Sequence, residues 1–246
     1  MTSLADELAF AHELADAADA VALPYFVNRS FHLDWKANRT EVTEADRNTE
    51  STISSMVLDA RPGHGLFGEE HGLVGDASSP WRWVVDPIDG TSNFVRGIPV
   101  WASLIALVHD GEPVVGVVSA PALQRRWWAA RGLGAFSVGG RPCRVSTVAA
   151  LDEAQVSLTF SPGWDELGRG EALVALQRAA YRARGFGDFW QHMLVAEGAI
   201  DLAAVMVVVE EAGGTFTDRN GVRSWEHDTA ISSNGLLHAA AAGLAD

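Results

Sequence analysis

The sequence has one cysteine, Cys143, and no paired histidine motif. A single cysteine in 246 residues excludes an internal disulfide framework and any zinc site built from several thiolates. The eight histidines are scattered, and no two of them form the H-x-x-x-H pattern of a zinc protease helix. Chemistry that depends on such ligands is therefore not expected.

Positive charge is also scarce. The chain carries 18 lysines and arginines against 32 aspartates and glutamates, which gives a formal net charge of −14. Because no basic stripe exists to neutralise phosphates, we expect no nucleic-acid partner and no membrane partner. An acidic protein that binds an anionic small molecule needs cations to carry the recognition, and the charge is compatible with that arrangement.

Long apolar runs and a targeting segment are absent as well. Residues 1–23 carry acidic side chains throughout and no positively charged start, so we expect no signal peptide. No apolar run approaches membrane-spanning length, and we expect a cytoplasmic protein. With 246 residues, 48% of them hydrophobic, the chain can bury one substantial core. We expect a single domain, 1–246, with one lobe over about residues 1–150 and another over about residues 151–246.

Two carboxylates three positions apart follow an apolar run. Residues 83–85, Trp-Val-Val, predict the end of a buried strand. Pro87 has no N–H to give to a ladder, so we expect pairing to stop there and the chain to stay extended. Asp86 and Asp89 then emerge together at the strand tip, with the Ile88 carbonyl between them. Such an oxygen set favours a divalent cation.

A glycine and a helix start follow these acids. Gly90 lets the backbone approach a bound group closely, and the amides of Gly90, Thr91 and Ser92 face outward at an expected helix N-terminus. Amides of this kind favour an anion such as phosphate. The alternative is a structural one, in which an Asp-rich turn merely caps the helix. The combined strand, proline and Gly-Thr favour a site for metal and phosphate.

Further acids open or follow other predicted elements. Thr43 and Asp46 form a capping box for a helix, which is a sufficient structural reason for both. Glu69 and Glu70 follow the residues 65–68, Gly-Leu-Phe-Gly. Two adjacent acids on a strand point to opposite sides, so we expect only one of them to reach a metal.

Several of these stretches resemble one enzyme family. Residues 86–94, Asp-Pro-Ile-Asp-Gly-Thr-Ser-Asn-Phe, are similar to the signature of the inositol monophosphatase family of Mg²⁺-dependent phosphatases. Gly68-Glu69-Glu70 and the residues 211–214, Glu-Ala-Gly-Gly, resemble its other landmarks, and the likeness runs from about residue 36 to 234. Residues 96–104, 120–128 and 187–189 resemble the histidinol-phosphate phosphatases of this family from actinobacteria.

The resemblance implies a fold and a reaction. The fold is an α/β layered sandwich of the sugar-phosphatase type, and the assembly is a homodimer. The reaction is Mg²⁺-dependent hydrolysis of a phosphomonoester by direct attack of water, with two or three Mg²⁺ ions per site. Histidinol phosphate is the first choice of substrate, which would place the enzyme in histidine biosynthesis, and inositol 1-phosphate or another sugar phosphate is the alternative.

The resemblance also assigns roles to residues. The implied metal ligands are Glu69, Asp86, the Ile88 carbonyl, Asp89 and Asp201. The implied catalytic residues are Asp46, Thr91 and Glu69, with Thr91 holding the water while Asp46 accepts its proton. The implied substrate-binding residues are Gly90, Thr91, Ser92 and Asp188. For Asp188 two interpretations stay open, a cap for the helix that follows or a partner for the ammonium group of the substrate.

The chain departs from the family pattern after Ala204. The family has a strand, a turn and a Trp-Asp pair there, and that aspartate completes the metal site, but here Ala204 runs directly into Val205. Counted from upstream, Asp201 ends an ordinary strand; counted from Glu211, it stands where the metal-binding aspartate is expected. We expect a helix over residues 202–212 to present Asp201. An impaired relative with a structural or regulatory role is the alternative.

Other elements are predicted from periodicity and turn residues. We expect a first helix that Pro24 ends, a short hairpin or a loop over residues 31–43 that bears Lys36, and a mobile loop over residues 72–79. A meander of antiparallel strands is expected over residues 102–138. A strand over 154–160, helices over 171–181 and 189–197, and a final helix that includes Leu244 complete the expectation.

Overall fold

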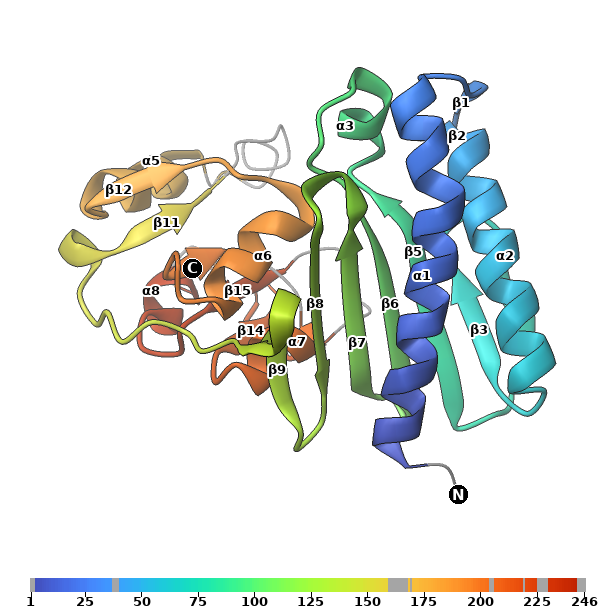
Figure 1. Ribbon diagram of the computed structural model, residues 1–246. Coiled ribbons are helices and arrows are strands. Elements are labelled where there is room, and N and C mark those ends of the chain that lie inside the picture. The colour runs from blue at the N-terminus through green and yellow to red at the C-terminus, as the bar shows by residue number, and fades with distance from the viewer. Residues whose placement is uncertain are drawn as a thin grey trace. The chain divides into compact units, whose positions relative to one another are not determined.

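The computed structural model divides the chain into two compact units (Figure 1). It describes residues 3–36, 40–158, 168, 170–203, 206–218, 220–224 and 230–242. The first unit comprises Met1–Arg131 and Ser137–Gly139, and the second comprises Gly132–Phe136 and Gly140–Asp246. Among the described residues, no helix is both long and apolar enough to cross a lipid bilayer.

The first unit is built on a twisted sheet whose strands follow the order β8-β7-β6-β5-β3-β4. All neighbours in it are antiparallel except β3 and β5, which are parallel. The predicted meander is therefore confirmed for β6, β7 and β8. The strands of this unit are β1 (Leu33–Trp35), β2 (Glu41–Thr43), β3 (Gly65–Gly68), β4 (Gly72–Gly75), β5 (Trp81–Asp89), β6 (Ala102–His109), β7 (Glu112–Ala120) and β8 (Arg125–Ala130).

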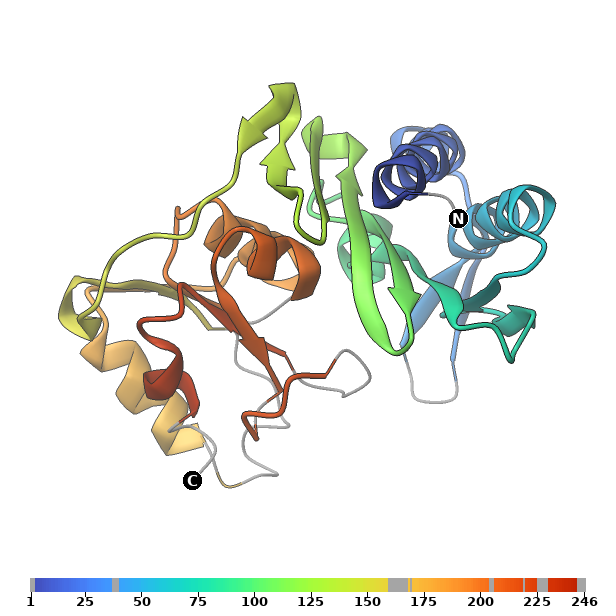
Figure 2. The ribbon, with the colours of Figure 1, turned by 90° about the horizontal axis from the view of Figure 1, so that it is seen from below.

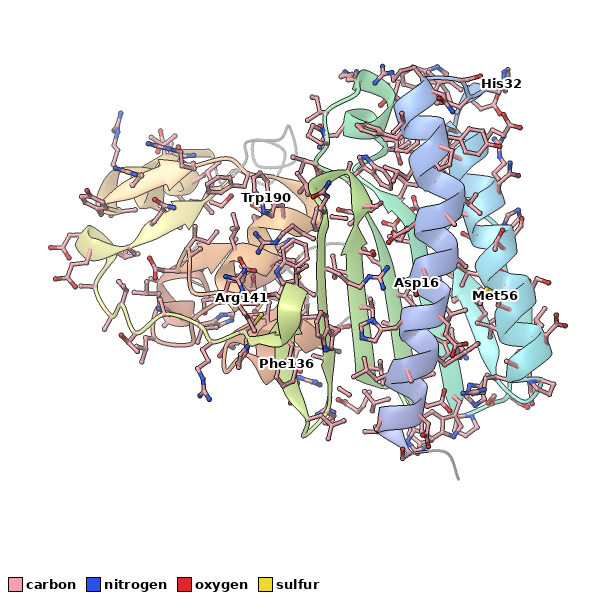
Figure 3. All side chains as sticks on the ribbon, in the orientation of Figure 1. Asp16, His32, Met56, Phe136, Arg141 and Trp190 are labelled. Atoms are coloured by element: carbon pink, nitrogen blue, oxygen red, sulfur yellow. The ribbon has the colours of Figure 1, made fainter. Side chains whose placement is uncertain are left out.

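Two long helices cover one face of this sheet (Figure 1). They are α1 (Leu4–Asn28) and α2 (Glu44–Ala60), and short helices α3 (Thr91–Arg96), η1 (Pro121–Leu123) and η2 (Val138–Gly140) complete the unit. Their inward apolar faces meet the sheet in one buried cluster that includes Leu14, Ile53, Trp83, Ile105 and Val115. Met56 of α2, labelled in Figure 3, packs against it from the edge.

The prediction that Pro24 ends the first helix is wrong. Helix α1 continues through Pro24 to Asn28 and ends at Arg29, which has a left-handed φ of 54°. A proline inside a helix removes one N–H bond and crowds the preceding turn. Beyond it, however, Phe26 packs with Phe94 and Trp101, and this aromatic contact offsets the loss.

Two further predictions for the first unit have different outcomes. The hairpin over residues 31–43 is confirmed, since β1 and β2 pair antiparallel. The mobile loop over residues 72–79 is wrong in its first part, because β4 pairs with β3 in full register from Gly72 to Gly75. The glycines and serines of residues 72–79 favour a loop, but an edge strand tolerates glycine where little side-chain packing is required.

The second unit has a five-stranded sheet in the order β12-β11-β13-β15-β14. Helices α6 and α7 pack together on one face, and α5 and α8 lie on the other (Figure 2). Its elements are β9 (Gly134–Ser137), β10 (Arg141–Pro142), η3 (Leu151–Glu153), β11 (Gln155–Ser157), α5 (Gly170–Ala179), β12 (Arg182–Arg184), α6 (Asp188–Ala196), β13 (Leu202–Ala203), α7 (Met206–Glu211), β14 (Thr215–Thr217), β15 (Ile231–Ser233) and α8 (His238–Ala242). Sheets covered by helices confirm the predicted α/β layered class.

The helix expected over residues 202–212 is wrong at its start. Leu202 and Ala203 form strand β13, which pairs with β11 on one side and β15 on the other, and α7 begins only at Met206. Both residues are apolar and fully buried in the sheet, and their pairing on both sides outweighs helical periodicity. The predicted junction between Ala204 and Val205 lies outside the described residues, as do Phe160 and Leu244.

Candidate active site

Strand β5 ends in an irregular turn that carries two of the predicted ligands. Asp86 pairs with Leu104 and Asp89 with Ala102, so the ladder slips between them, but the strand does not stop at Pro87 as predicted. Pro87 offers no N–H, and the Ile88 N–H turns back to Asp86 Oδ1 at 3.1 Å. The bulge thereby accommodates Pro87 within the strand, and Asp86 and Asp89 both lie at the strand tip.

Gly90 connects this turn to α3 in a left-handed conformation, with φ 86° and ψ 35°. Only glycine adopts such angles without strain, so the residue type is required here. Directly after it, Thr91 Oγ1 lies 3.0 Å from the Ile88 carbonyl oxygen and 3.2 Å from Asp46 Oδ1. The structure therefore brings the predicted pair of Thr91 and Asp46 into hydrogen-bond contact.

Asp46 uses its two oxygens for two different purposes. Oδ2 accepts from the Thr43 backbone N–H at 2.8 Å and from Thr43 Oγ1 at 2.6 Å, which is the predicted capping box of α2. Oδ1 is left for Thr91. Burial, and to a smaller extent the charge of Glu70, raises the pKa of Asp46 to about 6. A carboxylate of this kind is suited to accept a proton near neutral pH.

Glu69 and Glu70 both contact Lys36. Lys36 Nζ lies 2.8 Å from Glu69 Oε1 and 2.7 Å from Glu70 Oε1. The prediction that the two acids point apart is wrong, because they lie in the turn after β3 and not on the strand, so alternation does not apply. Glu69 is the more accessible of the two, with 47% of its side chain exposed against 7% for Glu70.

The acids of the site repel one another. Burial, followed by the charges of Asp89 and Glu69, raises the pKa of Asp86 well above its ordinary value, and Asp46 adds to the effect. Lys36 is the cation that reaches Glu69. Carboxylate and carbonyl oxygens are the ligands that Mg²⁺ prefers, and a cation would relieve this repulsion. The donor set thus fits Mg²⁺, although no three acidic, histidine or cysteine side chains of the described residues already surround one point as a finished cage.

The predicted substrate-binding residues lie in two places. Gly90, Thr91 and Ser92 open α3, where the Gly90 carbonyl accepts the first helical bonds from Asn93 and Phe94. The Ser92 hydroxyl donates to Glu41 Oε2, which also pairs with Arg96 at 3.2 Å. The Ser92 side chain is therefore engaged within the first unit, and its backbone amide is the group that stays suited to an anion.

Asp188 opens α6 of the second unit in an unusual conformation. Its φ is 45°, in the left-handed region that costs a non-glycine residue energy. The interpretation of Asp188 as the N-cap residue is wrong, because α6 already begins at Asp188 and Gly187 is its N-cap residue. Trp190, labelled in Figure 3, lies on the same helix and packs edge-on against Phe186 with ring centres 5.6 Å apart.

Asp201 is held inside the second unit by both of its oxygens. Oδ1 accepts from the Ser146 hydroxyl, and Oδ2 accepts from the Gln155 backbone N–H at 2.7 Å. Asn234 reinforces the group through a 2.9 Å bond from its Nδ2 to Ser146 Oγ. The role of Asp201 as a metal ligand stays a prediction, and a metal would have to replace these bonds.

The sequence has a Trp-Asp pair elsewhere, Trp164-Asp165, upstream of the position where the family has one and outside the described residues. It stands before Asp201, not after it, so it does not restore the family order.

Two residues beside the site, Glu50 and His71, were not predicted from the sequence. Glu50 is fully buried on α2, and it binds the turn that carries Glu69. Its spacing of one helical turn from Asp46 was a usable signal, since both side chains then share a face. His71 offered no signal, because its contact with Glu50 depends on how the turn after β3 folds back.

The fold and this set of acids agree with comparisons to known proteins. The chain belongs to the inositol monophosphatase family, whose model matches residues 3–246. Members of this family are metal-dependent, typically on Mg²⁺. The chain is 49% identical over 249 residues to a histidinol-phosphatase of Mycobacterium tuberculosis, with 95% of each chain covered. It is 44% identical to a histidinol-phosphatase of Streptomyces coelicolor, with 97% of this chain and 96% of that one covered.

A solved structure of the family has the same fold. The IMPase of Thermotoga maritima superimposes with a TM-score of 0.86 at 29% identity, and the match covers 98% of this chain and 96% of that one. The expected family membership and fold are both confirmed.

Proposed function

We propose that this chain is a Mg²⁺-dependent phosphomonoesterase that hydrolyses histidinol phosphate to histidinol and phosphate. The observation that carries the proposal is the gathering of mutually repelling acids around Asp86, at the tip of β5. The choice of substrate is supported by the histidinol-phosphatases that match at 49% and 44% identity over nearly the whole chain.

The first unit supplies the proposed metal ligands. They are Glu69, Asp86, Asp89 and the Ile88 carbonyl. Asp201, which the resemblance also implies, is left out of this proposed set because both of its oxygens already accept hydrogen bonds. Bound Mg²⁺, as two or three ions, would lower the pKa of water and neutralise the charge of the phosphoryl oxygens. Glu69 would have to exchange its bond to Lys36 for this role, and its exposure leaves room for that exchange.

Thr91 and Asp46 are the proposed groups that handle the proton. The Thr91 hydroxyl contacts Asp46 Oδ1, so a water that donates to Thr91 can pass its proton on to Asp46 through one hydroxyl. The raised pKa of Asp46 supports the role, because a carboxyl with a pKa of about 6 holds a proton better than an ordinary aspartate. The capping bond to Oδ2 fixes the carboxylate in place meanwhile. No covalent intermediate on a serine, cysteine or histidine is proposed.

The amides of Gly90, Thr91 and Ser92 are the proposed phosphate donors, and Asp188 is the proposed partner of the substrate's ammonium group. The left-handed conformation of Asp188 supports a role beyond packing, because strained residues of this kind persist where function requires them. A homodimer stays a prediction from the resemblance, and a cytoplasmic location stays a prediction from the sequence.

The test is phosphate release in the presence of Mg²⁺ from histidinol phosphate, inositol 1-phosphate and fructose 1,6-bisphosphate, each with a control in excess EDTA. We expect metal-dependent release with a clear preference for histidinol phosphate. Equal rates on the three substrates would keep the chemistry and overturn the substrate. A folded protein that releases no phosphate from any of them would favour the impaired relative.

A further inference from the structure

Glu50 is a buried acid that the proposed reaction does not use. It lies on α2, and its side chain is fully shielded from solvent. Burying a carboxylate is costly unless hydrogen bonds or charges compensate it. Within the part of the chain that the structure describes, the compensation comes from the turn after β3 and not from a lysine or arginine.

Three donors of that turn converge on the Glu50 carboxylate. Oε2 accepts from the Glu70 backbone N–H at 2.8 Å. Oε1 accepts from the His71 backbone N–H at 2.8 Å and contacts His71 Nδ1 at 2.8 Å. In the tautomer with its hydrogen on Nδ1, the His71 ring donates to Oε1. The Glu50 carboxylate thus accepts hydrogen bonds from two consecutive residues of one turn, Glu70 and His71.

Gly68 shows how closely Glu50 approaches this turn. A Cβ atom built on Gly68 would overlap the Glu50 carboxylate. The φ of Gly68 is not left-handed, so the glycine is required by space and not by backbone angles. Strand β3 therefore ends with a residue whose missing side chain makes room for Glu50.

The residue between these fixed points is Glu69. The backbone N–H of Glu69 donates to the Val85 carbonyl oxygen at 3.2 Å, and the backbone N–H of Glu70 donates to Glu50. The backbone of Glu69 is thereby fixed on both sides, and only its side-chain angles remain adjustable. Asp46, one turn earlier on α2, holds Thr91 in the same manner. One face of α2 thus orients both the Glu69 turn and the start of α3.

We propose that Glu50 is a positioning residue for the metal centre: by holding the turn after β3 through two backbone amides and His71, it sets the affinity of Glu69 and its neighbours for a divalent cation. This inference rests on the proposed function, since it concerns the same site. Groups that orient metal ligands from behind commonly change metal affinity by about 10- to 100-fold when they are removed.

The experiment compares Glu50→Gln with Glu7→Gln. Glu7 is the matched control, because it is also a buried acid of the first unit, but its oxygens bind Arg61 at 3.1 Å, away from the turn. Binding of Mn²⁺, as a probe for Mg²⁺, is followed by the electron paramagnetic resonance signal of the free ion, and melting temperatures are recorded in EDTA. We expect both variants to melt at lower temperature, but only Glu50→Gln to bind Mn²⁺ at least about 10-fold more weakly.

Wild-type affinity in a folded Glu50→Gln protein would overturn the inference and leave Glu50 as a fold anchor. Equal weakening in both variants would overturn it too, because loss of stability alone would then explain the effect. If Glu50→Gln does not fold, His71→Ala is the deciding variant, because His71 is partly exposed and the substitution removes only one donor to Glu50. A loss of Mn²⁺ affinity of about threefold supports the inference, and unchanged affinity overturns it. A wild type that binds no Mn²⁺ would instead overturn the proposed function itself.

Discussion

One cluster of acids in the first unit and the buried acids of the second unit have opposite surroundings. In the first unit, Asp86 is surrounded by Asp89, Glu69 and Asp46, and burial followed by these charges raises its pKa. In the second unit, Asp201 and Asp218 are surrounded by neutral donors: Asp201 accepts from Ser146 and Gln155, and Asp218 accepts from the backbone N–H groups of Asn220 and Val222 at 2.8 and 2.7 Å.

This contrast distinguishes acids that serve the fold from acids that serve a ligand. A carboxylate with hydrogen-bond donors on both oxygens stabilises the folded chain and needs no ion. Carboxylates that face one another destabilise it until a cation binds, and natural proteins tolerate such an arrangement where function requires it. The residues of the inositol monophosphatase signature lie in the first unit, whereas the second unit has acids that its own sheet uses.

The largest expected effect is that of Asp86→Asn. We expect phosphate release from histidinol phosphate to fall by a factor of about 1,000 or more, equivalent to about 4 kcal/mol, because a ligand at the centre of the cluster is lost. Without metal, the same substitution removes repulsion, so the melting temperature in EDTA should stay equal or rise. A variant that loses activity together with its metal-free stability would show that Asp86 serves the fold.

Thr91→Val should have the next largest effect. Valine keeps the shape of threonine but removes the hydroxyl that joins the Ile88 carbonyl to Asp46. We expect kcat to fall by about 100-fold, as is usual for loss of a group in a proton transfer, with little change in Mn²⁺ binding. Thr91→Ser is the control and should retain most of kcat. Equal losses in the two variants would assign the effect to packing and not to the hydroxyl.

The sequence was a good guide to the first unit's site because the signals there are local. Pro87, Gly90 and the capping box at Thr43 each dictate their own backbone geometry, so the strand tip, the start of α3 and the start of α2 could all be predicted. What failed was the extent of elements: β5 passes Pro87, and α1 passes Pro24, because tertiary packing outweighs a missing N–H.

Contacts between distant segments could not be predicted in the same way. Lys36 reaches Glu69 and Glu70 only because a hairpin and a turn far along the chain meet. The partners of Asp201 are 55 and 46 positions away, at Ser146 and Gln155. A motif assigns Asp201 to a metal from spacing alone, whereas the donors around it depend on how β11 and β13 pair.

Asp201→Asn tests whether the second unit shares in the metal site. Asparagine has one acceptor oxygen, so either Ser146 or Gln155 loses its partner, and we expect the free energy of unfolding to fall by about 1–3 kcal/mol. With both oxygens already engaged, we expect Mn²⁺ affinity to change less than about twofold, far below the effect expected of a lost ligand. A loss of 10-fold or more would instead give Asp201 its predicted place among the ligands.

The smallest expected effect is on the pH dependence of the free energy of unfolding, to which one residue of each unit contributes with opposite sign. Asp46 has a pKa of about 6, above the ordinary 3.8, so the folded state binds a proton before the unfolded state does. Its contribution therefore grows more favourable as the pH falls, by about 1 kcal/mol between about pH 7 and pH 5. His192 is the reverse case: burial lowers its pKa from 6.5 to about 3, so the unfolded state binds the proton first. Stability is lost below about pH 6.5, by about 2 kcal/mol at about pH 5.

Urea unfolding in EDTA at these two pH values, on the wild type, Asp46→Asn and His192→Gln, separates the two contributions. Asp46→Asn should lose the gain in stability on acidification, and His192→Gln should lose the decrease in stability. His192 contacts Ser232 at 3.2 Å, and glutamine retains a polar group there without a charge that titrates in this range. If both variants shift the pH dependence in the same direction, burial and the charge of Glu70 do not hold the pKa of Asp46 above its ordinary value, and the expected difference between Asp46 and His192 is wrong.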